Sequence, residues 1–291
     1  MKLGMILPQI EIGNDPAVIR DFAQAAEDLG FDHLVAFDHV LGANAASRAE
    51  WKGPYTHVDA FHEVFVLFGY LAACTRRIEL STQVLILPQR QTALVAKQAA
   101  QVDLLSNGRL RLGIGVGWND VEYEALGEDF GNRGRRCEEQ IDVLRALWSA
   151  ELVTFEGRYH RVTDAGINPL PVQRPIPLWI GGEAEPVMRR TARKADGWLP
   201  RVHGQYAKGD GGASLLARMR AICEEEGRDP STLGLERWVH NLERGPADWG
   251  RDIEQWASLG GTHLSLNTIR GGLRSPAEHI QTMRRYKEAL G

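Results

Sequence analysis

The sequence of 291 residues is poor in cysteine and contains no long apolar run. Its three cysteines, Cys74, Cys137 and Cys223, are odd in number and far apart, which excludes a disulfide framework and is typical of reduced thiols. No apolar stretch is long enough to cross a bilayer, and the first residues lack the charged start and apolar core of a signal peptide. We therefore expect a cytoplasmic protein with no membrane association.

Charge of one sign is not in excess either, and several reactive motifs are missing. The formal net charge is −4, so the composition does not indicate a basic surface for binding nucleic acid. The sequence has no Gly-x-Ser-x-Gly motif and no cysteine with a convincing nearby base, which disfavours nucleophilic catalysis. His57, Asp59 and His62 do not have convincing ligand spacing, and we expect no metal site.

What the sequence does contain is a regular alternation of strand-like and helix-like segments. Such alternation implies parallel strands joined by crossover helices, and eight units match a closed (β/α)8 barrel. An open, doubly wound sheet is the alternative, but the first strand lacks the glycine-rich turn that would follow it there. We predict one α/β domain over residues 1–291, a (β/α)8 TIM barrel. The expected strands are residues 1–7, 33–37, 78–87, 110–118, 178–180, 197–199, 235–240 and 263–265.

Two insertions interrupt this repeat, after the second and the fourth strand. Residues 39–60 form a long connection, and residues 150–177 contain a predicted β-hairpin followed by a proline-rich stretch. Long loops in a compact fold are usually functional, and we expect both on the C-terminal side of the strands, where barrels carry their sites. A glycine-rich stretch at residues 204–212 is expected to be disordered.

The predicted fourth strand has glycine at every second position, namely Gly113, Gly115 and Gly117. Alternate residues of a strand point to one face, so this face carries no side chains. Because glycine is a poor strand former, we expect something large to lie close to the backbone. A planar cofactor ring and a crowded barrel interior both satisfy the pattern.

The C-terminal end of the second strand carries the residues best suited to catalysis. Asp38 and His39 follow this strand directly, and histidine titrates near neutral pH and suits proton transfer. A histidine hydrogen-bonded into a loop is the alternative. Tyr55 and Trp118 lie near the same predicted end of the barrel. They either form walls of a pocket or simply pack against their neighbours.

Two further segments lie at or within strands of the same barrel. Gly181 and Gly182 precede a helix, where backbone N–H groups can hold a phosphate, although the nearby Glu183 and Glu185 would repel an anion unless they point away. Gln83-Val84 lies within a strand that looks ordinary without further context.

Several motifs together resemble the bacterial luciferase-like monooxygenase superfamily, and most closely its branch of F420-dependent oxidoreductases. They occur in the family order and lie within about the first 200 residues, whereas the last third resembles the family only in its strand-helix rhythm. The motifs are Phe-Asp-His-Val at 37–40, Ala-Ala-Cys-Thr-Arg-Arg-Ile-Glu-Leu at 72–80, the glycine strand at 112–118, Glu-Tyr-Glu-Ala-Leu-Gly at 122–127, Arg-Gly at 133–134 before Glu-Glu at 138–139, Arg-Pro-Ile-Pro-Leu-Trp-Ile-Gly-Gly at 174–182, and Ala-Asp-Gly-Trp at 195–198.

The resemblance implies the (β/α)8 barrel and a flavin or deazaflavin at its C-terminal mouth. It also implies a non-proline cis peptide at Gln83–Val84 that makes a bulge behind the cofactor ring. His39 matches the histidine that related dehydrogenases use as proton donor or acceptor, and we expect Asp38 to orient it. The implied cofactor-binding residues are Gln83, Val84, Gly115, Val116 and Gly117 at the ring and Gly181, Gly182 and Glu183 at the phosphate.

The sequence departs from the family pattern at three places. Trp118 stands where the sugar-phosphate dehydrogenases carry a catalytic glutamate, and no lysine follows the Asp-Gly motif, so an apolar or aromatic substrate fits better than a phosphosugar. Gly134 stands where the FMN-dependent monooxygenases often have tyrosine, which leaves room for a longer cofactor tail and favours F420.

We therefore expect hydride transfer between coenzyme F420 and a small organic substrate. His39 and Asp38 would manage the proton, Tyr55 and Trp118 would wall the substrate pocket, and residues 151–177 would close over it. One alternative is an FMN-dependent monooxygenase supplied with reduced flavin by a partner reductase. Another is a non-catalytic flavin-binding relative, which the presence of Asp38 and His39 disfavours. The resemblance also implies a homodimer.

Overall fold

The computed structural model describes residues 1–201 and 212–290, so most of the glycine-rich stretch at 204–212 lies outside the described residues. Within these ranges the parallel strands close into a barrel in the order β3-β2-β1-β11-β10-β9-β8-β5-β4, with β3 also pairing to β5. Because β3 and β4 both pair with β5, they are two parts of one barrel strand. The barrel therefore has eight strands, which confirms the prediction from the sequence. The bounds are β1 (Lys2–Ile6), β2 (His33–Ala36), β3 (Glu79–Thr82), β4 (Leu85–Ile86), β5 (Leu110–Gly115), β8 (Leu178–Gly181), β9 (Gly197–Leu199), β10 (Gly234–His240) and β11 (His263–Asn267).

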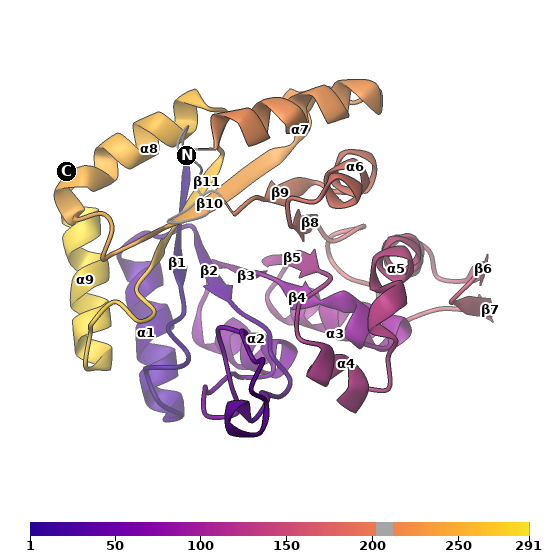
Figure 1. Ribbon diagram of the computed structural model, residues 1–291, viewed down its shortest axis with the longest axis horizontal. Coiled ribbons are helices and arrows are strands. Elements are labelled where there is room, and N and C mark those ends of the chain that lie inside the picture. Colours follow the sequence, from indigo (N-terminus) through magenta and orange to yellow (C-terminus); the bar gives the residue numbers. More distant parts are fainter. Residues whose placement is uncertain (202–211, 291) are drawn as a thin grey trace.

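Helices surround the barrel, as Figure 1 shows. The start of α1 shows how the sequence sets a helix boundary: the side chain of Asp15 accepts a hydrogen bond from Ala17 N–H at 2.8 Å, and Pro16 occupies the first turn. The described helices are α1 (Pro16–Asp28), α2 (Val64–Cys74), α3 (Thr92–Leu105), α4 (Asp120–Ala125), α5 (Arg133–Ser149), α6 (Glu185–Lys194), α7 (Ala213–Glu225), α8 (Trp249–Ser258) and α9 (Pro276–Glu288). None of the helices in the described ranges is long and apolar enough to cross a bilayer.

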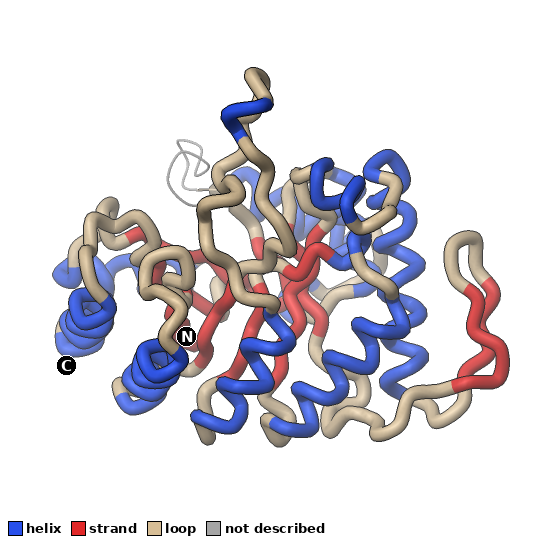
Figure 2. Tube along the Cα trace, turned by 90° about the horizontal axis from the view of Figure 1, so that it is seen from below, coloured by secondary structure: helices blue, strands red, loops and turns tan. Residues whose placement is uncertain are grey.

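The two insertions take different positions. The connection after β2 rises from the C-terminal ends of the strands and projects from the barrel, with the short helix η1 (Ala45–Ser47) near its tip (Figure 2). The predicted hairpin is present as the antiparallel pair β6 (Val153–Glu156) and β7 (Arg161–Ala165), but it lies outside the helical ring (Figures 1 and 2).

The hairpin does not close over a pocket, and this expectation was wrong. His160, between the two hairpin strands, is 2.7 Å from the Thr92 hydroxyl at the start of α3 and 2.8 Å from Glu139 of α5. The insertion follows α5 and precedes β8, so it belongs to a helix-to-strand connection, whereas barrel sites are built from strand-to-helix connections.

A buried polar cluster fills the N-terminal end of the barrel interior. The Arg111 guanidinium donates to Glu79 at 2.5 Å and to Glu236 at 2.6 Å, and His33 Nε2 lies 2.9 Å from the other oxygen of Glu236. Burial acts to raise the pKa of Glu236, but Arg111 and His33 hold it well below the usual value. The Arg111 guanidinium also lies 4.4 Å from the centre of the Trp179 ring.

Apolar side chains gather at the C-terminal end of the interior. Ile6, Val35 and Ile269 form a small cluster of their own, separate from the main core. Phe37 and Trp238 pack against it while remaining only partly buried. This end of the barrel therefore offers apolar and aromatic surface at the C-terminal ends of the strands, which we call the mouth.

Candidate active site

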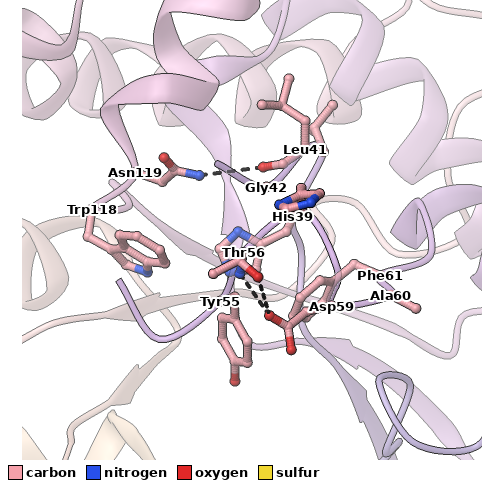
Figure 3. A pocket seen from close by; sticks show the side chains of 12 residues that line it. His39, Leu41, Gly42, Tyr55, Thr56, Asp59, Ala60, Phe61, Trp118 and Asn119 are labelled. Atoms are coloured by element: carbon pink, nitrogen blue, oxygen red, sulfur yellow. Dashed lines mark hydrogen bonds between the residues drawn. The ribbon is translucent and has the colours of Figure 1, made fainter. Parts of the chain in front are cut away.

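A cavity of about 250 Å³ lies at the mouth, between the connection after β2 and the segment that follows β5 (Figure 3). Two of the three chain segments that line it belong to the connection after β2. The lining residues are His39, Val40, Leu41, Gly42, Tyr55, Thr56, His57, Asp59, Ala60, Phe61, Trp118 and Asn119. The structure thus brings His39, Tyr55 and Trp118 together, as the sequence predicts.

His39 is enclosed by aromatic rings. Its ring centre lies 4.7 Å from that of Phe61, 5.2 Å from Tyr55 and 5.6 Å from Trp118. Trp118 is 40% exposed and is contacted on another side by Trp51 at 5.6 Å. The imidazole therefore borders aromatic rings on several sides, and a small organic molecule in the cavity would contact them.

The carboxylate that contacts His39 is Glu122, at 3.2 Å from Nδ1. Its side chain is 1% exposed and comes from α4, the short helix that follows Trp118. Burial acts to raise the pKa of Glu122, but the hydrogen bonds from His39, Gln89 and Val40 lower it overall. Sequence reasoning gave Glu122 no role; its only signal was its place in the 122–127 motif.

Asp38 does not orient His39, contrary to the prediction. Its carboxylate accepts hydrogen bonds from Arg90 at 2.7 Å and from Ile86 N–H at 3.1 Å. Burial raises the pKa of Asp38, and Arg90 opposes this shift. Asp38 therefore ties the end of β2 to β4 and the start of α3, behind the cavity.

The peptide bond between Gln83 and Val84 is cis, as the resemblance implies, and it separates β3 from β4. The glycines that face this bulge have protein neighbours. A Cβ on Gly115 would lie 2.5 Å from Val84 Cγ2, and one on Gly117 would lie 2.7 Å from Ile86 Cγ2. Side chains of the neighbouring strand therefore fill the face of β5 that carries no side chains. This is the crowded barrel interior, one of the two explanations offered for the glycine pattern. The strand itself ends at Gly115, and Gly117 has a φ of +65°.

Gly113 is the tightest of these positions. A Cβ there would lie 2.0 Å from the carbonyl oxygen of Thr82, a backbone atom that cannot rotate away. We expect Gly113→Ala to lower the free energy of unfolding by about 1–3 kcal/mol or more, as is usual when a side chain is forced into a filled core. Urea denaturation measures this.

Gly250 supplies the matched control for this prediction. It lies in the first turn of α8, and a Cβ there would meet only Leu290 Cδ2, at 4.0 Å. Gly250→Ala should therefore leave stability unchanged or raise it by up to about 1 kcal/mol. Equal stability of the two variants would contradict the crowding at β5.

The predicted phosphate residues lie at the end of β8. Gly182 has a φ of +127°, and its carbonyl accepts a hydrogen bond from Trp198 Nε1 at 2.7 Å. Glu183 points away from the helix: its carboxylate accepts from Arg201 N–H at 3.0 Å. The N-terminus of α6, which follows, has no capping side chain.

The outer wall of the cavity, residues 54–61, is attached to the barrel by Arg270. This side chain donates to the Pro54 carbonyl at 3.0 Å and to Asp59 at 2.9 Å, and it lies 5.2 Å from the centre of the Tyr55 ring. Asp59 also accepts from Thr56 N–H at 2.7 Å. The wall is thus held by a residue that follows β11, far away in the sequence.

Fold and site together define a TIM-barrel protein with an imidazole–carboxylate pair in an aromatic cavity at the mouth. The family model for luciferase-like monooxygenases matches residues 2–240. The chain therefore belongs to the luciferase-like monooxygenase family, whose members are F420-dependent oxidoreductases or flavin-dependent monooxygenases. It is an oxidoreductase of this family.

Individual relatives agree with this assignment. An uncharacterized protein of Mycobacterium tuberculosis is 36% identical over 214 residues, which cover 71% of each chain. The pyrimidine monooxygenase of Allorhizobium ampelinum is 28% identical over 244 residues, 78% of this chain and 64% of the relative. The F420-dependent glucose-6-phosphate dehydrogenase of Kineococcus radiotolerans is 29% identical over 256 residues, 84% of this chain and 69% of the relative.

Solved structures share the fold at lower identity. The monooxygenase RslO1 from Streptomyces bottropensis superposes with a TM-score of 0.79 at 19% identity, covering 100% of this chain and 98% of its own. An F420-dependent secondary alcohol dehydrogenase, solved with an F420–acetone adduct, superposes with a TM-score of 0.74 at 18% identity and covers 100% and 99%. These matches support the closed barrel.

Proposed function

We propose that this protein transfers a hydride between coenzyme F420 and a small, uncharged organic substrate. The observation that carries the proposal is the His39–Glu122 pair in the aromatic cavity. The ring lines the cavity, Nδ1 faces Glu122, and Nε2 has no hydrogen-bond partner among the residues that the structure describes. An imidazole held in this way is suited to give a proton to a substrate oxygen or to take one from it.

The residues at the bulge fit a cofactor ring. Gln83 and Val84 are both only partly buried, and Gln83 Nε2 is a buried donor without a partner among the described residues. We propose that Val84 supports the ring, with Val116 beside it, and that the glycines Gly115 and Gly117 serve this seat by making room for the bulge. When bound, the deazaflavin supplies the carbon that accepts or donates the hydride.

We further propose that Gly181, Gly182 and Glu183 meet the cofactor phosphate with their backbone. The uncapped N-terminus of α6 supports this, because free N–H groups at a helix start favour an anion. The Glu183 side chain, engaged by Arg201, leaves the backbone approachable.

The charges in the lining of the cavity support one proposal about the substrate class. It contains no lysine or arginine among the described residues, and its carboxylate, Asp59, is engaged by Arg270 and Thr56. Phosphate or carboxylate groups would have no cationic partner there. Tyr55, Phe61 and Trp118 instead offer aromatic surface, so we propose an alcohol or carbonyl compound of low polarity.

The second candidate is an FMN-dependent monooxygenase that receives reduced flavin from a partner reductase. The likeness to the pyrimidine monooxygenase supports it. His39 and Glu122 support the first candidate, because a proton donor and acceptor beside the substrate is what oxidation of an alcohol or reduction of a carbonyl requires.

Parallel titrations with F420 and with FMN test the proposal. We expect F420 to bind in the micromolar range, followed by its intrinsic fluorescence, and FMN to bind far more weakly. Micromolar binding of FMN without binding of F420 would overturn it in favour of the monooxygenase. Binding of F420 with no turnover of any alcohol or carbonyl compound would leave a non-catalytic flavin-binding protein.

We also propose that the protein is a cytoplasmic homodimer. Its three free cysteines support a reducing location. On α2, Val66 is 73% exposed and Tyr70 is 37% exposed, which is typical of an apolar helix face covered by a second copy. Light scattering coupled to gel filtration measures the mass, and a monomer at micromolar concentration would contradict the dimer.

A further inference from the structure

We propose that Glu122 is the positioning residue of this site: it fixes the orientation and tautomer of His39, so that Nε2 is the atom that exchanges a proton with the substrate. The inference rests on the function proposed above for His39. It assigns a role to a carboxylate 83 residues further along the chain.

Both carboxylate oxygens of Glu122 are used. Oε1 accepts from the backbone N–H groups of Val40 at 2.9 Å and Leu41 at 3.3 Å, and it faces His39 Nδ1 at 3.2 Å. Oε2 accepts from Gln89 Nε2 at 3.2 Å and lies 3.4 Å from the same imidazole nitrogen. With four donors around it and 1% exposure, this carboxylate cannot turn toward the solvent.

Glu122 thereby connects the two sides of the cavity. It belongs to α4, the helix that directly follows Trp118 and Asn119. Its carboxylate accepts hydrogen bonds from the backbone of Val40 and Leu41, which lie on the opposite wall. Asn119 adds a hydrogen bond to the Leu41 carbonyl at 3.4 Å, drawn in Figure 3. The position of the imidazole is therefore set by the same contacts that set the width of the cavity.

The other ionisable groups around the cavity have different partners. Asp38 is paired with Arg90, which also binds Glu63 at 2.9 Å. Asp59 is held by Arg270. Of the remaining groups, Tyr55 contacts the His39 ring through its own ring, and burial raises the pKa of its phenol, which keeps it neutral. His57 lines the same cavity and is exposed.

The chemical consequence follows from the two ring nitrogens. A carboxylate at Nδ1 can only accept, so the proton of a neutral imidazole stays on Nδ1 and Nε2 carries the lone pair. When Nε2 takes a proton from a substrate hydroxyl, the imidazolium is stabilised by Glu122, and in the reverse direction the proton returns from Nε2 to the substrate oxygen. Glu122 itself neither gains nor loses a proton.

The variant Glu122→Gln removes the charge and keeps the shape. The new amide oxygen can still accept from Val40, Leu41 and His39. The new amide nitrogen would face the donor of Gln89, but Gln89 Oε1 has no partner among the described residues, and a flip of that amide presents it. Glu124→Gln, on the exposed side of the same helix, is the matched control.

The direct readout is the tautomer of the neutral His39 ring in the free protein, read from the ¹⁵N chemical shifts of its two ring nitrogens and assigned with a His39 variant among the nine histidines. We expect the proton on Nδ1 in wild type. Glu122→Gln should lower the share of this Nδ1–H form, because a neutral amide oxygen holds the N–H less strongly than a carboxylate does. Glu124→Gln should leave the share unchanged. The same tautomer populations in wild type, Glu122→Gln and Glu124→Gln would overturn the inference.

A second variant and a kinetic measurement complete the test. Glu122→Asp keeps the charge but withdraws it, so its share of the Nδ1–H form should lie between those of wild type and Glu122→Gln; this variant also serves if Glu122→Gln does not fold. With F420, Glu122→Gln should lower kcat about tenfold or more with little change in KM. A change of tautomer without any F420-dependent turnover would reject the proposed function and keep the Glu122–His39 coupling.

Discussion

Replacing His39 with alanine is expected to lower F420-dependent turnover about 10²- to 10⁴-fold, the range that a positioned acid or base contributes. The imidazole lies in the cavity with its Nε2 uncommitted among the described residues. The other histidine of the lining, His57, has no carboxylate partner among the described residues. Steady-state kinetics at several pH values measures the loss. The cofactor dissociation constant should change by less than about threefold, because the proposed ring seat lies at Gln83 and Val84.

His57→Ala is the matched control for this prediction. His57 lines the same cavity, but it is exposed and has no carboxylate partner among the described residues. Turnover of this variant should stay within about twofold of wild type. Equal losses in the two variants would show that the cavity needs bulk at these positions and would remove the proton-transfer role of His39.

Replacing Arg111 with methionine is expected to cause the largest loss of stability, about 3–5 kcal/mol in the free energy of unfolding. The substitution fills the space of the side chain stem but leaves Glu236 buried without its guanidinium partner at 2.6 Å. It also removes the stack on Trp179. Urea denaturation measures the loss, with Lys194→Met as control, since Lys194 pairs with Asp142 at the surface and such pairs contribute about 1 kcal/mol or less.

The pH dependence of this loss has a defined sign. The folded-state pKa of Glu236 lies well below the unfolded one, so its contribution to stability is present above the unfolded value and is lost as the pH falls through the folded value. The difference between wild type and Arg111→Met should therefore be large near neutral pH and shrink under acid conditions. A difference that grows toward low pH would contradict this account. If Arg111→Met does not fold, Arg111→Lys, which keeps a positive charge near Glu236 but loses the guanidinium that bonds both Glu236 and Glu79, should show the same trend at smaller size.

The barrel could be predicted from the sequence because alternating strands and helices have few arrangements in which the apolar faces of both are buried. The glycine strand shows where this reasoning stops. Alternate glycines at 113, 115 and 117 reveal that something approaches the backbone, but not what it is, and the neighbour turned out to be the β3–β4 strand with Val84. Which of two neighbours fills a bare face depends on how far the next strand bulges, and this is a tertiary property.

The partner of His39 could not be read from local spacing either. Asp38 is adjacent in sequence, but adjacent side chains of an extended segment point in opposite directions, and Asp38 meets Arg90 instead. The partner Glu122 comes from a helix of six residues that the periodicity did not predict. Its contact with His39 exists only because the barrel brings the ends of β2 and β5 to one rim.

Arg270 gives the C-terminal part of the chain an influence on the cavity that the family match would not suggest, because that match ends at residue 240. This one side chain holds Pro54, Tyr55 and Asp59, and it is itself 53% exposed. Because this clamp is open to solvent, we expect its loss to loosen the wall at residues 54–61 and to shorten the time that a bound molecule stays behind it. An exchange at position 270 would then alter product release while leaving the imidazole and its carboxylate unchanged.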